Sequence, residues 1–288
     1  MMETKQQRIA IVTDSTSDIP RELVEKYGII VVPQILIMGQ ETWRDGVEID
    51  PATFYEMLRT SPHFPASSQP SVKDFRDRFV ELAEDHDGIV AVLVSNELSG
   101  TINSAVTAAA SLPEIPVEII DSRSVSVQLG FIVLEAVREA ARGGDLEAVT
   151  GVARRLIGRV QVYFIVDTLE YLHRNGRIGA AARLFGTALN IKPVLCIDDG
   201  IVTPVAKVRS RRKALERVFG LVEKDLVAGG PVHMAVLHVA APDEAARLGD
   251  ELEQRFGPAE MIRTECGPVI GTHAGPGTVG VAFYAEAG

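Results

Sequence analysis

Cysteine is scarce in this chain of 288 residues, which contains only Cys196 and Cys266. The two lie far apart and form no C-x-x-C pair, so the sequence excludes a cysteine zinc cluster and a thioredoxin-type redox motif. We expect two reduced thiols rather than a disulfide.

Long apolar runs are also lacking. The apolar segments, such as 29–32 and 89–94, have the length of strands, and no segment reaches the ~20 residues needed to cross a bilayer. The N-terminal residues MMETKQQR lead directly into a strand-like segment, so we expect no signal peptide. These absences predict a cytoplasmic protein with no transmembrane segment.

Positive charge is limited and unevenly distributed. The net charge of −10 argues against binding to nucleic acid. Segment 171–217, however, carries ten Lys and Arg against three Asp and Glu, a net charge of +7, which leaves −17 for the rest of the chain. This asymmetry is compatible with a docking face for an acidic partner or a phosphate, and equally with a basic solvated surface.

The common catalytic and nucleotide-binding signatures are missing. The sequence has no G-x-x-x-x-G-K-[ST] loop, no G-x-S-x-G elbow, and no H-E-x-x-H among its six histidines. Residues 275–280 match G-x-G-x-x-G, but only eight strand-like residues follow, whereas a dinucleotide fingerprint must open a helix. The sequence therefore predicts neither a metal nor a cofactor.

The periodicity of the chain predicts an α/β protein with two domains. Strand-like segments at 8–13, 29–32, 89–94 and 117–120 alternate with helical ones, which indicates a parallel sheet covered on both faces. Beyond residue 157 the pattern changes, because the apolar runs 191–197 and 201–208 are joined by an Asp-Asp-Gly turn typical of a hairpin. We predict a Rossmann-like, parallel-sheet α/β/α sandwich over 1–157 and a mixed-sheet α/β domain over 158–288.

Four polar segments are candidates for a binding site: 13–18, 67–71, 99–101 and 271–277. Ser99-Gly100-Thr101 follows a strand and opens a helix, where unpaired N–H groups and a hydroxyl favour an anion. The same segment also suits a simple helix cap without a ligand. His273 lies in what the sequence indicates is a glycine-rich loop, where a ligand or the backbone can approach closely.

Nine segments in order resemble the DegV family of bacterial fatty-acid-binding proteins. They are VTDSTSDIP (12–20), DGVEI (45–49), SSQPS (67–71), LSGT (98–101), IIDSRSVS (119–126), DTLEYLHRNGRIG (167–179), NIKPVL (190–195), VRSRRKAL (208–215) and GTHAGPGTVGVAF (271–283). The resemblance spans nearly the whole chain. It implies two α/β domains with a long-chain fatty acid bound between them.

The resemblance also implies the roles of particular residues. Ser67, which stands where the family usually has threonine, and Ser99 would hold the carboxylate, with His273 in the same polar network and secondary roles for Ser95 and Thr101. The chain would not be an enzyme by itself. It would present the fatty acid to a separate ATP-binding kinase subunit, and the acyl phosphate would enter phospholipid synthesis. Three arginines fall in segments near the expected docking face for that subunit: Arg174, Arg177 and Arg209.

Neutral hydroxyl donors suit such a carboxylate, because a direct arginine pair would hold it tightly and reduce its nucleophilicity. Two other interpretations stay open at this level. One is a serine-dependent hydrolase or acyl transferase that uses Ser99 and His273. The other is a carrier for a different amphipathic carboxylate.

Overall fold

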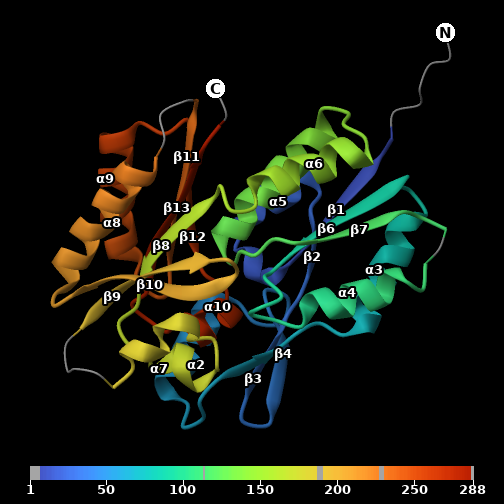
Figure 1. The fold of residues 1–288 in the computed structure, drawn as a ribbon. Coiled ribbons are helices and arrows are strands. Elements are labelled where there is room, and N and C mark those ends of the chain that lie inside the picture. The colour runs from blue at the N-terminus through green and yellow to red at the C-terminus, as the bar shows by residue number, and fades with distance from the viewer. Residues whose placement is uncertain (1–6, 113, 187–190, 227–229, 287–288) are drawn as a thin grey trace.

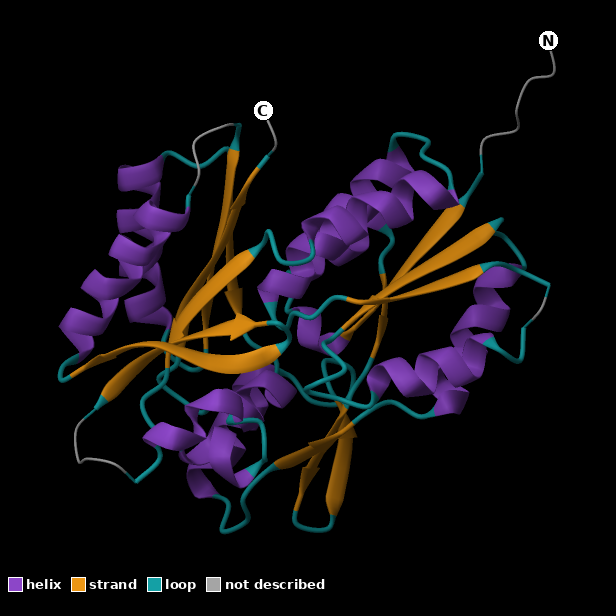
Figure 2. Cartoon of the chain, viewed as in Figure 1, coloured by secondary structure: helices purple, strands orange, loops and turns teal. Residues whose placement is uncertain are grey.

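The computed structural model describes residues 7–112, 114–186, 191–226 and 230–286. Its strands fall into three groups, a parallel sheet, a mixed sheet and a small antiparallel sheet (Figures 1 and 2). Asn190, the first residue of the NIKPVL segment, lies outside the described residues. No helix of the described residues is long and apolar enough to cross a membrane.

The parallel sheet has the strand order β2-β1-β6-β7, and every neighbouring pair is parallel. All six residues of β6 are buried, as expected for a central strand covered on both faces. Helices α3 and α4 cover one face, and α5 and α6 cover the other. The elements of this part are β1 (Ile9–Asp14), the short 3-10 turn η1 (Ser15–Ser17), α1 (Arg21–Tyr27), β2 (Ile30–Val32), α3 (Val72–Ala83), β6 (Gly88–Leu93), α4 (Thr101–Ala109), β7 (Val117–Asp121), α5 (Val127–Ala141) and α6 (Leu146–Leu156).

The mixed sheet has the order β10-β9-β8-β13-β11-β12, in which only β11 and β12 run parallel. Helices α8 and α9 cover its outer face. The predicted hairpin is confirmed, because β9 and β10 pair antiparallel on either side of Asp199 and Gly200. Both turn residues have positive φ, as a two-residue hairpin turn of type I′ requires. The elements are β8 (Gln161–Ile165), α7 (Glu170–Arg174), η2 (Gly179–Leu184), β9 (Lys192–Asp198), β10 (Ile201–Val208), α8 (Arg211–Asp225), β11 (Val232–His238), α9 (Pro242–Phe256), β12 (Glu260–Glu265), α10 (Pro268–Ala274) and β13 (Val279–Ala285).

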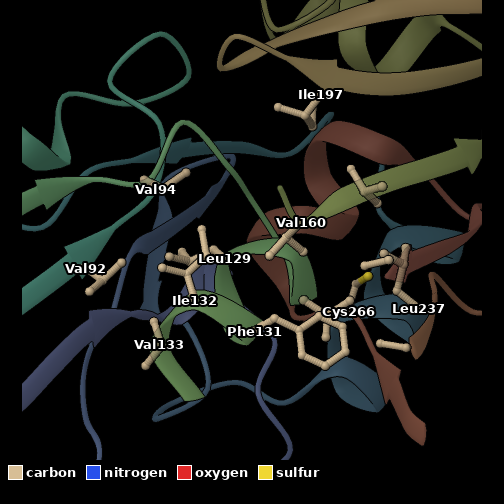
Figure 3. Close-up of a cluster of buried hydrophobic side chains, with 14 of the residues drawn as sticks. Val92, Val94, Leu129, Phe131, Ile132, Val133, Val160, Ile197, Leu237 and Cys266 are labelled. Atoms are coloured by element: carbon tan, nitrogen blue, oxygen red, sulfur yellow. The ribbon is translucent and has the colours of Figure 1, made fainter. Parts of the chain in front are cut away.

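The inner faces of the two sheets share one hydrophobic core. Val92 and Val94, which belong to the first sheet and the loop after it, lie in the same cluster as Ile197 and Leu237 of the mixed sheet, with α5 between them (Figure 3). The parallel-sheet and mixed-sheet architecture is therefore as predicted. The boundary between residues 157 and 158 stays a prediction, and it falls in the connection between α6 and β8.

Two elements differ from the sequence-based expectation. Strand β5 (Ala66–Ser68) is not among the strands that the sequence analysis predicts. It pairs with β3 (Ile35–Met38), which also pairs with β4 (Glu41–Arg44), so the three strands form the small sheet. Helix α2 (Pro51–Thr60) lies between β4 and β5 in the chain. The segment around His273 is not only a glycine-rich loop, because Pro268–Ala274 forms α10. This helix contacts α2, β3 and β5, so a segment near the C-terminus reaches into the first half of the molecule (Figure 1).

Candidate functional site

A large cavity lies between the parallel-sheet and mixed-sheet parts. Its empty space, including the open mouth, is about 870 Å³. Most of the wall is apolar and comes from both parts: Val94, Leu98, Val125, Val162, Phe164, Leu172, Ile197, Val202, Leu237, Val269, Ile270 and Ala274. The polar side chains of the wall are Thr16, Gln34, Ser67, Ser68, Gln69, Ser99, Ser126, Arg177, His273 and Thr278.

Strand β5 and helix α10 bring two of the predicted site residues into direct contact. The distance between Ser67 Oγ and His273 Nε2 is 2.7 Å, although 206 residues separate them. Ser67 is held in place by the pairing of β5 with β3, in which it faces Leu36. His273 and Ser67 are therefore in direct contact, and their joint role in holding a carboxylate stays a prediction.

Buried carboxylates fix the start of the helix that carries His273. Asp18 Oδ1 accepts the N–H of Gly267 at 2.8 Å, and Asp18 Oδ2 accepts the hydroxyl of Ser126 at 2.5 Å. Asp45, which accepts the Ser15 hydroxyl at 2.7 Å, lies beside the same glycine. Burial raises the pKa of Asp18 and of Asp45 to about 7. The polar segment 13–18 thus positions α10 as well as lining the cavity through Thr16.

His273 is held in its neutral form. Burial lowers its pKa to about 3, and the positive charge of Arg177 acts in the same direction. Its Nδ1 is buried and has no hydrogen-bond partner among the described residues. A lone pair left without a partner is tolerated better than a buried N–H, so the proton belongs on Nε2. In that tautomer Nε2 donates to Ser67 Oγ, and the Ser67 hydroxyl is free to donate to a ligand.

This arrangement argues against the predicted hydrolase dyad. His273 contacts Ser67, whereas the Ser99 hydroxyl lies 2.8 Å from the hydroxyl of Thr101. A general base also needs a pKa near the working pH and a group that orients its second nitrogen. The pairing of Ser99 with His273 expected for a serine hydrolase is therefore not the pairing that the structure has.

A hydrogen-bond network connects Ser99 to the interior of the parallel sheet. Gln34 Nε2 donates to Thr101 Oγ1 at 2.9 Å and to Asp14 Oδ1 at 3.1 Å. Asp14 also accepts from the Thr16 backbone and hydroxyl and from the backbone N–H of Val94. Burial raises the pKa of Asp14, and these donors counteract the shift. Thr101 is fully buried and lies behind Ser99 rather than in the wall.

Two predicted residues lie elsewhere than expected. Ser95, expected to have a secondary role at the carboxylate, is buried outside the wall and donates its hydroxyl to Gly200 O at 2.9 Å. It therefore joins the loop after β6 to the hairpin of the mixed sheet. Arg177, expected on a docking face, is part of the cavity wall, where its Nε donates to Leu98 O at 3.1 Å and its Nη1 to Asn175 O at 2.6 Å.

The other two predicted docking arginines are exposed. Arg174 forms an ion pair with Glu170 at 2.8 Å and lies over the ring of Phe64 at 4.6 Å from its centroid. Arg209 lies between β10 and α8 on the surface. The positions of these two residues are compatible with a docking face.

Gln34 was not among the predicted site residues, although it lines the cavity and links Asp14 to Thr101. A signal for it was available, because it follows shortly after the second strand of a parallel sheet. Ligands bind beyond the carboxyl ends of such strands.

The fold and the site define an α/β protein whose cavity has an apolar wall and a set of hydroxyl groups with one guanidinium. The chain belongs to the DegV family, since the family model described as "Uncharacterised protein, DegV family" matches residues 8–286. Protein DegV of Bacillus subtilis is 33% identical over 276 residues, which cover 96% of this chain and 98% of that protein. A DegV domain-containing protein of Streptomyces coelicolor is 42% identical over 276 residues, covering 95% of this chain and 97% of the relative.

Solved structures of relatives have the same fold. A DegV family protein from Thermus thermophilus, described by its fatty-acid binding, has a TM-score of 0.92 at 36% identity and covers 97% of this chain and 100% of its own. DegV from Bacillus subtilis, described as a fatty acid binding protein, has a TM-score of 0.91 at 32% identity with the same coverage. A stearic-acid-binding protein from Eubacterium ventriosum has a TM-score of 0.88 at 26% identity and covers 96% of this chain and 98% of its own.

The charge state of His273 gives a testable pH dependence. We expect the ring resonances of His273 to stay unchanged in NMR spectra between about pH 8 and about pH 5. His233 should titrate above the usual histidine pKa, because Glu260, with a further contribution from Glu286, raises its pKa. Folding lowers the pKa of His273, so the imidazole becomes protonated at a higher pH in the unfolded chain than in the folded one. As the pH falls from about 6.5 towards about 3, this residue therefore lowers the free energy of unfolding. A His273 midpoint near that of a solvated histidine would contradict this account.

Proposed function

We propose that this chain binds one long-chain fatty acid in the cavity, with the carboxylate at Ser67, Ser99 and His273. The observation that carries the proposal is a mostly apolar cavity whose wall also holds these three side chains and Arg177. Relatives described as fatty-acid-binding proteins with the same fold support it. The acyl chain would lie between the inner face of the mixed sheet and the loops that follow the strands of the parallel sheet.

The acyl chain supplies most of the affinity in this proposal. Burying each CH₂ contributes about 0.8 kcal/mol, so a C16 tail offers on the order of 10 kcal/mol before the entropy costs of binding. The head-group contacts mainly fix the orientation of the fatty acid. Ser67 and Ser99 would donate their hydroxyl protons to the two carboxylate oxygens.

Arg177 changes the electrostatics expected from the sequence, which assigned the carboxylate to neutral donors alone. A buried carboxylate without an opposite charge is costly. The guanidinium of Arg177 lies in the wall and acts on His273, but two of its N–H groups are directed to backbone carbonyl groups. We therefore assign Arg177 the role of a nearby positive charge rather than that of a docking residue.

The finer part of the proposal is that the bound fatty acid is presented to a separate ATP-binding kinase subunit. A carboxylate oxygen would attack the γ-phosphorus of ATP, giving an acyl phosphate for phospholipid synthesis and releasing ADP. Phosphoryl transfer depends mainly on positioning and on stabilising charge, and the partner would supply ATP and Mg²⁺. The basic segment 171–217 and the exposed Arg174 and Arg209 support a docking role for this face.

The head-group assignment predicts a selective loss in the Ser67→Ala/Ser99→Ala double variant. Because each of the two hydrogen bonds to a charged group contributes about 1.5–3 kcal/mol, the Kd for palmitate should rise at least about 100-fold. Binding of 1-hexadecanol, which has the same tail and no charge, should weaken much less. The measurement is direct binding to delipidated protein, with Ser61→Ala/Ser111→Ala as a control that removes two hydroxyls outside the cavity. Equal losses for both ligands would refute the assignment.

The docking proposal predicts that Arg209→Glu lowers turnover by a fatty-acid kinase subunit about tenfold and leaves the Kd for palmitate unchanged. Arg247→Glu is the matched control, because it reverses the charge of an exposed arginine on α9, outside the basic segment. Kinase assays with a purified ATP-binding subunit provide the measurement. Normal turnover by the Arg209 variant would remove this part of the proposal.

A further inference from the structure

The direction of the Ser99 hydroxyl is the feature that goes beyond the proposed site residues. Ser99 stands at the end of a chain of side chains that runs through Thr101 and Gln34 to Asp14. Only Ser99 and Gln34 of these four line the cavity. A hydroxyl can either donate or accept a hydrogen bond, whereas an ionised carboxylate only accepts. The Ser99 hydroxyl can therefore bind a carboxylate only if its proton points into the cavity.

Asp14 determines the orientation of the Gln34 amide. Four donors reach its carboxylate: the Thr16 backbone N–H, the Thr16 hydroxyl, the Val94 N–H and the Gln34 amide. Asp14 therefore acts as an acceptor in each of these contacts, as an ionised carboxylate does. Turning the amide of Gln34 around would place its oxygen against the carboxylate, so the NH₂ group is fixed in place.

The fixed amide in turn determines the role of Thr101. Gln34 Nε2 donates its second proton to Thr101 Oγ1, at 2.9 Å. The single proton of Thr101 then needs an acceptor of its own, because Thr101 is completely buried and water does not reach it. In the described part of the chain that acceptor is Ser99 Oγ, at 2.8 Å.

We infer that Asp14, Gln34 and Thr101 are positioning residues that direct the hydroxyl proton of Ser99 into the cavity and so make Ser99 a donor for a carboxylate. With its oxygen occupied by Thr101, Ser99 directs its own proton to the side that lines the cavity. His273 acts in the same sense on Ser67, whose oxygen accepts from Nε2. The inference rests on the proposed function and adds head-group selectivity to it: an anionic head group is favoured over a neutral one.

The test compares Thr101→Val, which keeps the shape and removes the hydroxyl, with Thr101→Ser, which keeps the hydroxyl. Kd values for palmitate and for 1-hexadecanol are measured on delipidated protein. We expect Thr101→Val to weaken palmitate binding by about three- to tenfold, the value of one hydrogen bond, and to leave hexadecanol binding unchanged. Thr101→Ser should restore the wild-type preference. Thr107→Val, an exposed position of the same helix, controls for the effect of valine on α4.

The outcomes separate this inference from the proposed function. If Thr101→Val keeps the palmitate preference, or loses both ligands equally, the inference is overturned while the carrier function stands. If the wild type binds neither ligand, the proposed function itself fails. If Thr101→Val does not fold, Gln34→Met replaces it in the test, because it breaks the link between Asp14 and Thr101. We expect Gln34→Met to reduce the preference for palmitate over 1-hexadecanol, given by the ratio of the two Kd values. An unchanged ratio overturns the inference.

Discussion

Delipidated protein that carries Val125→Asp should bind palmitate at least about 100-fold more weakly than the wild type, because a carboxylate buried against an acyl chain costs several kcal/mol. Val125 lies in the loop before α5 and lines the apolar part of the cavity. It is half-buried and packs at the edge of the core, so we expect the variant to fold. The Kd follows from titration with a fluorescent fatty acid and competition with palmitate.

The control for this prediction is Val106→Asp, which makes the same chemical change on the outer surface of α4. Val106 is 49% exposed, and it is not part of the cavity wall. The Val106→Asp variant should bind palmitate with the same Kd as the wild type. An unchanged Kd for Val125→Asp would show that the acyl chain does not lie in this cavity.

Gly275→Ala should lower the free energy of unfolding by about 2–4 kcal/mol, since a side chain here is opposed by both backbone conformation and packing. Gly275 ends α10 with φ 78° and ψ 158°, a region that is nearly restricted to glycine. A Cβ at this position would lie 2.4 Å from Cδ2 of Tyr171, whose ring packs against Phe64. Urea denaturation of the purified variants measures the change.

The matched control is Gly220→Ala in the interior of α8. A Cβ there would meet no heavy atom within 4 Å apart from its chain neighbours and the backbone of its own helix. Alanine is favoured over glycine in a helix, so this variant should gain about 0.5–1 kcal/mol. If both substitutions change the free energy of unfolding in the same direction, the end of α10 does not require a conformation that only glycine adopts.

The strands of the parallel and mixed sheets were predictable because their signals are local, whereas the small sheet of β3, β4 and β5 was not predicted. The fully apolar run at 89–94 corresponds to β6, the central buried strand, and the Asp199-Gly200 turn identifies the β9–β10 hairpin. The short helix α10 was harder to predict. Its sequence, Pro268–Ala274, contains a glycine and precedes another two, and it is held in place by contacts with α2, β3 and β5 and by the buried Asp18.

For the candidate site, the sequence suggested several of the residues that line the cavity but not how they are connected. Ser67, Ser99 and His273 lie in the wall of one cavity, as the resemblance implies. Which hydroxyl contacts His273 depends on the long-range pairing that brings β5 beside α10, and the sequence spacing does not encode it. For the same reason Arg177 was assigned to a docking face, although the turn after α7 directs it to the carbonyl of Leu98.

The identity of the molecule in the cavity is the central claim, and one measurement tests it most directly. The protein is purified without detergent, native and denaturing mass spectra are compared, and any released lipid is extracted and identified. We predict one equivalent of a fatty acid of about 14 to 18 carbons, bound through its acyl chain. A spectrum of ligand-free protein that also fails to bind added palmitate and oleate would contradict the account.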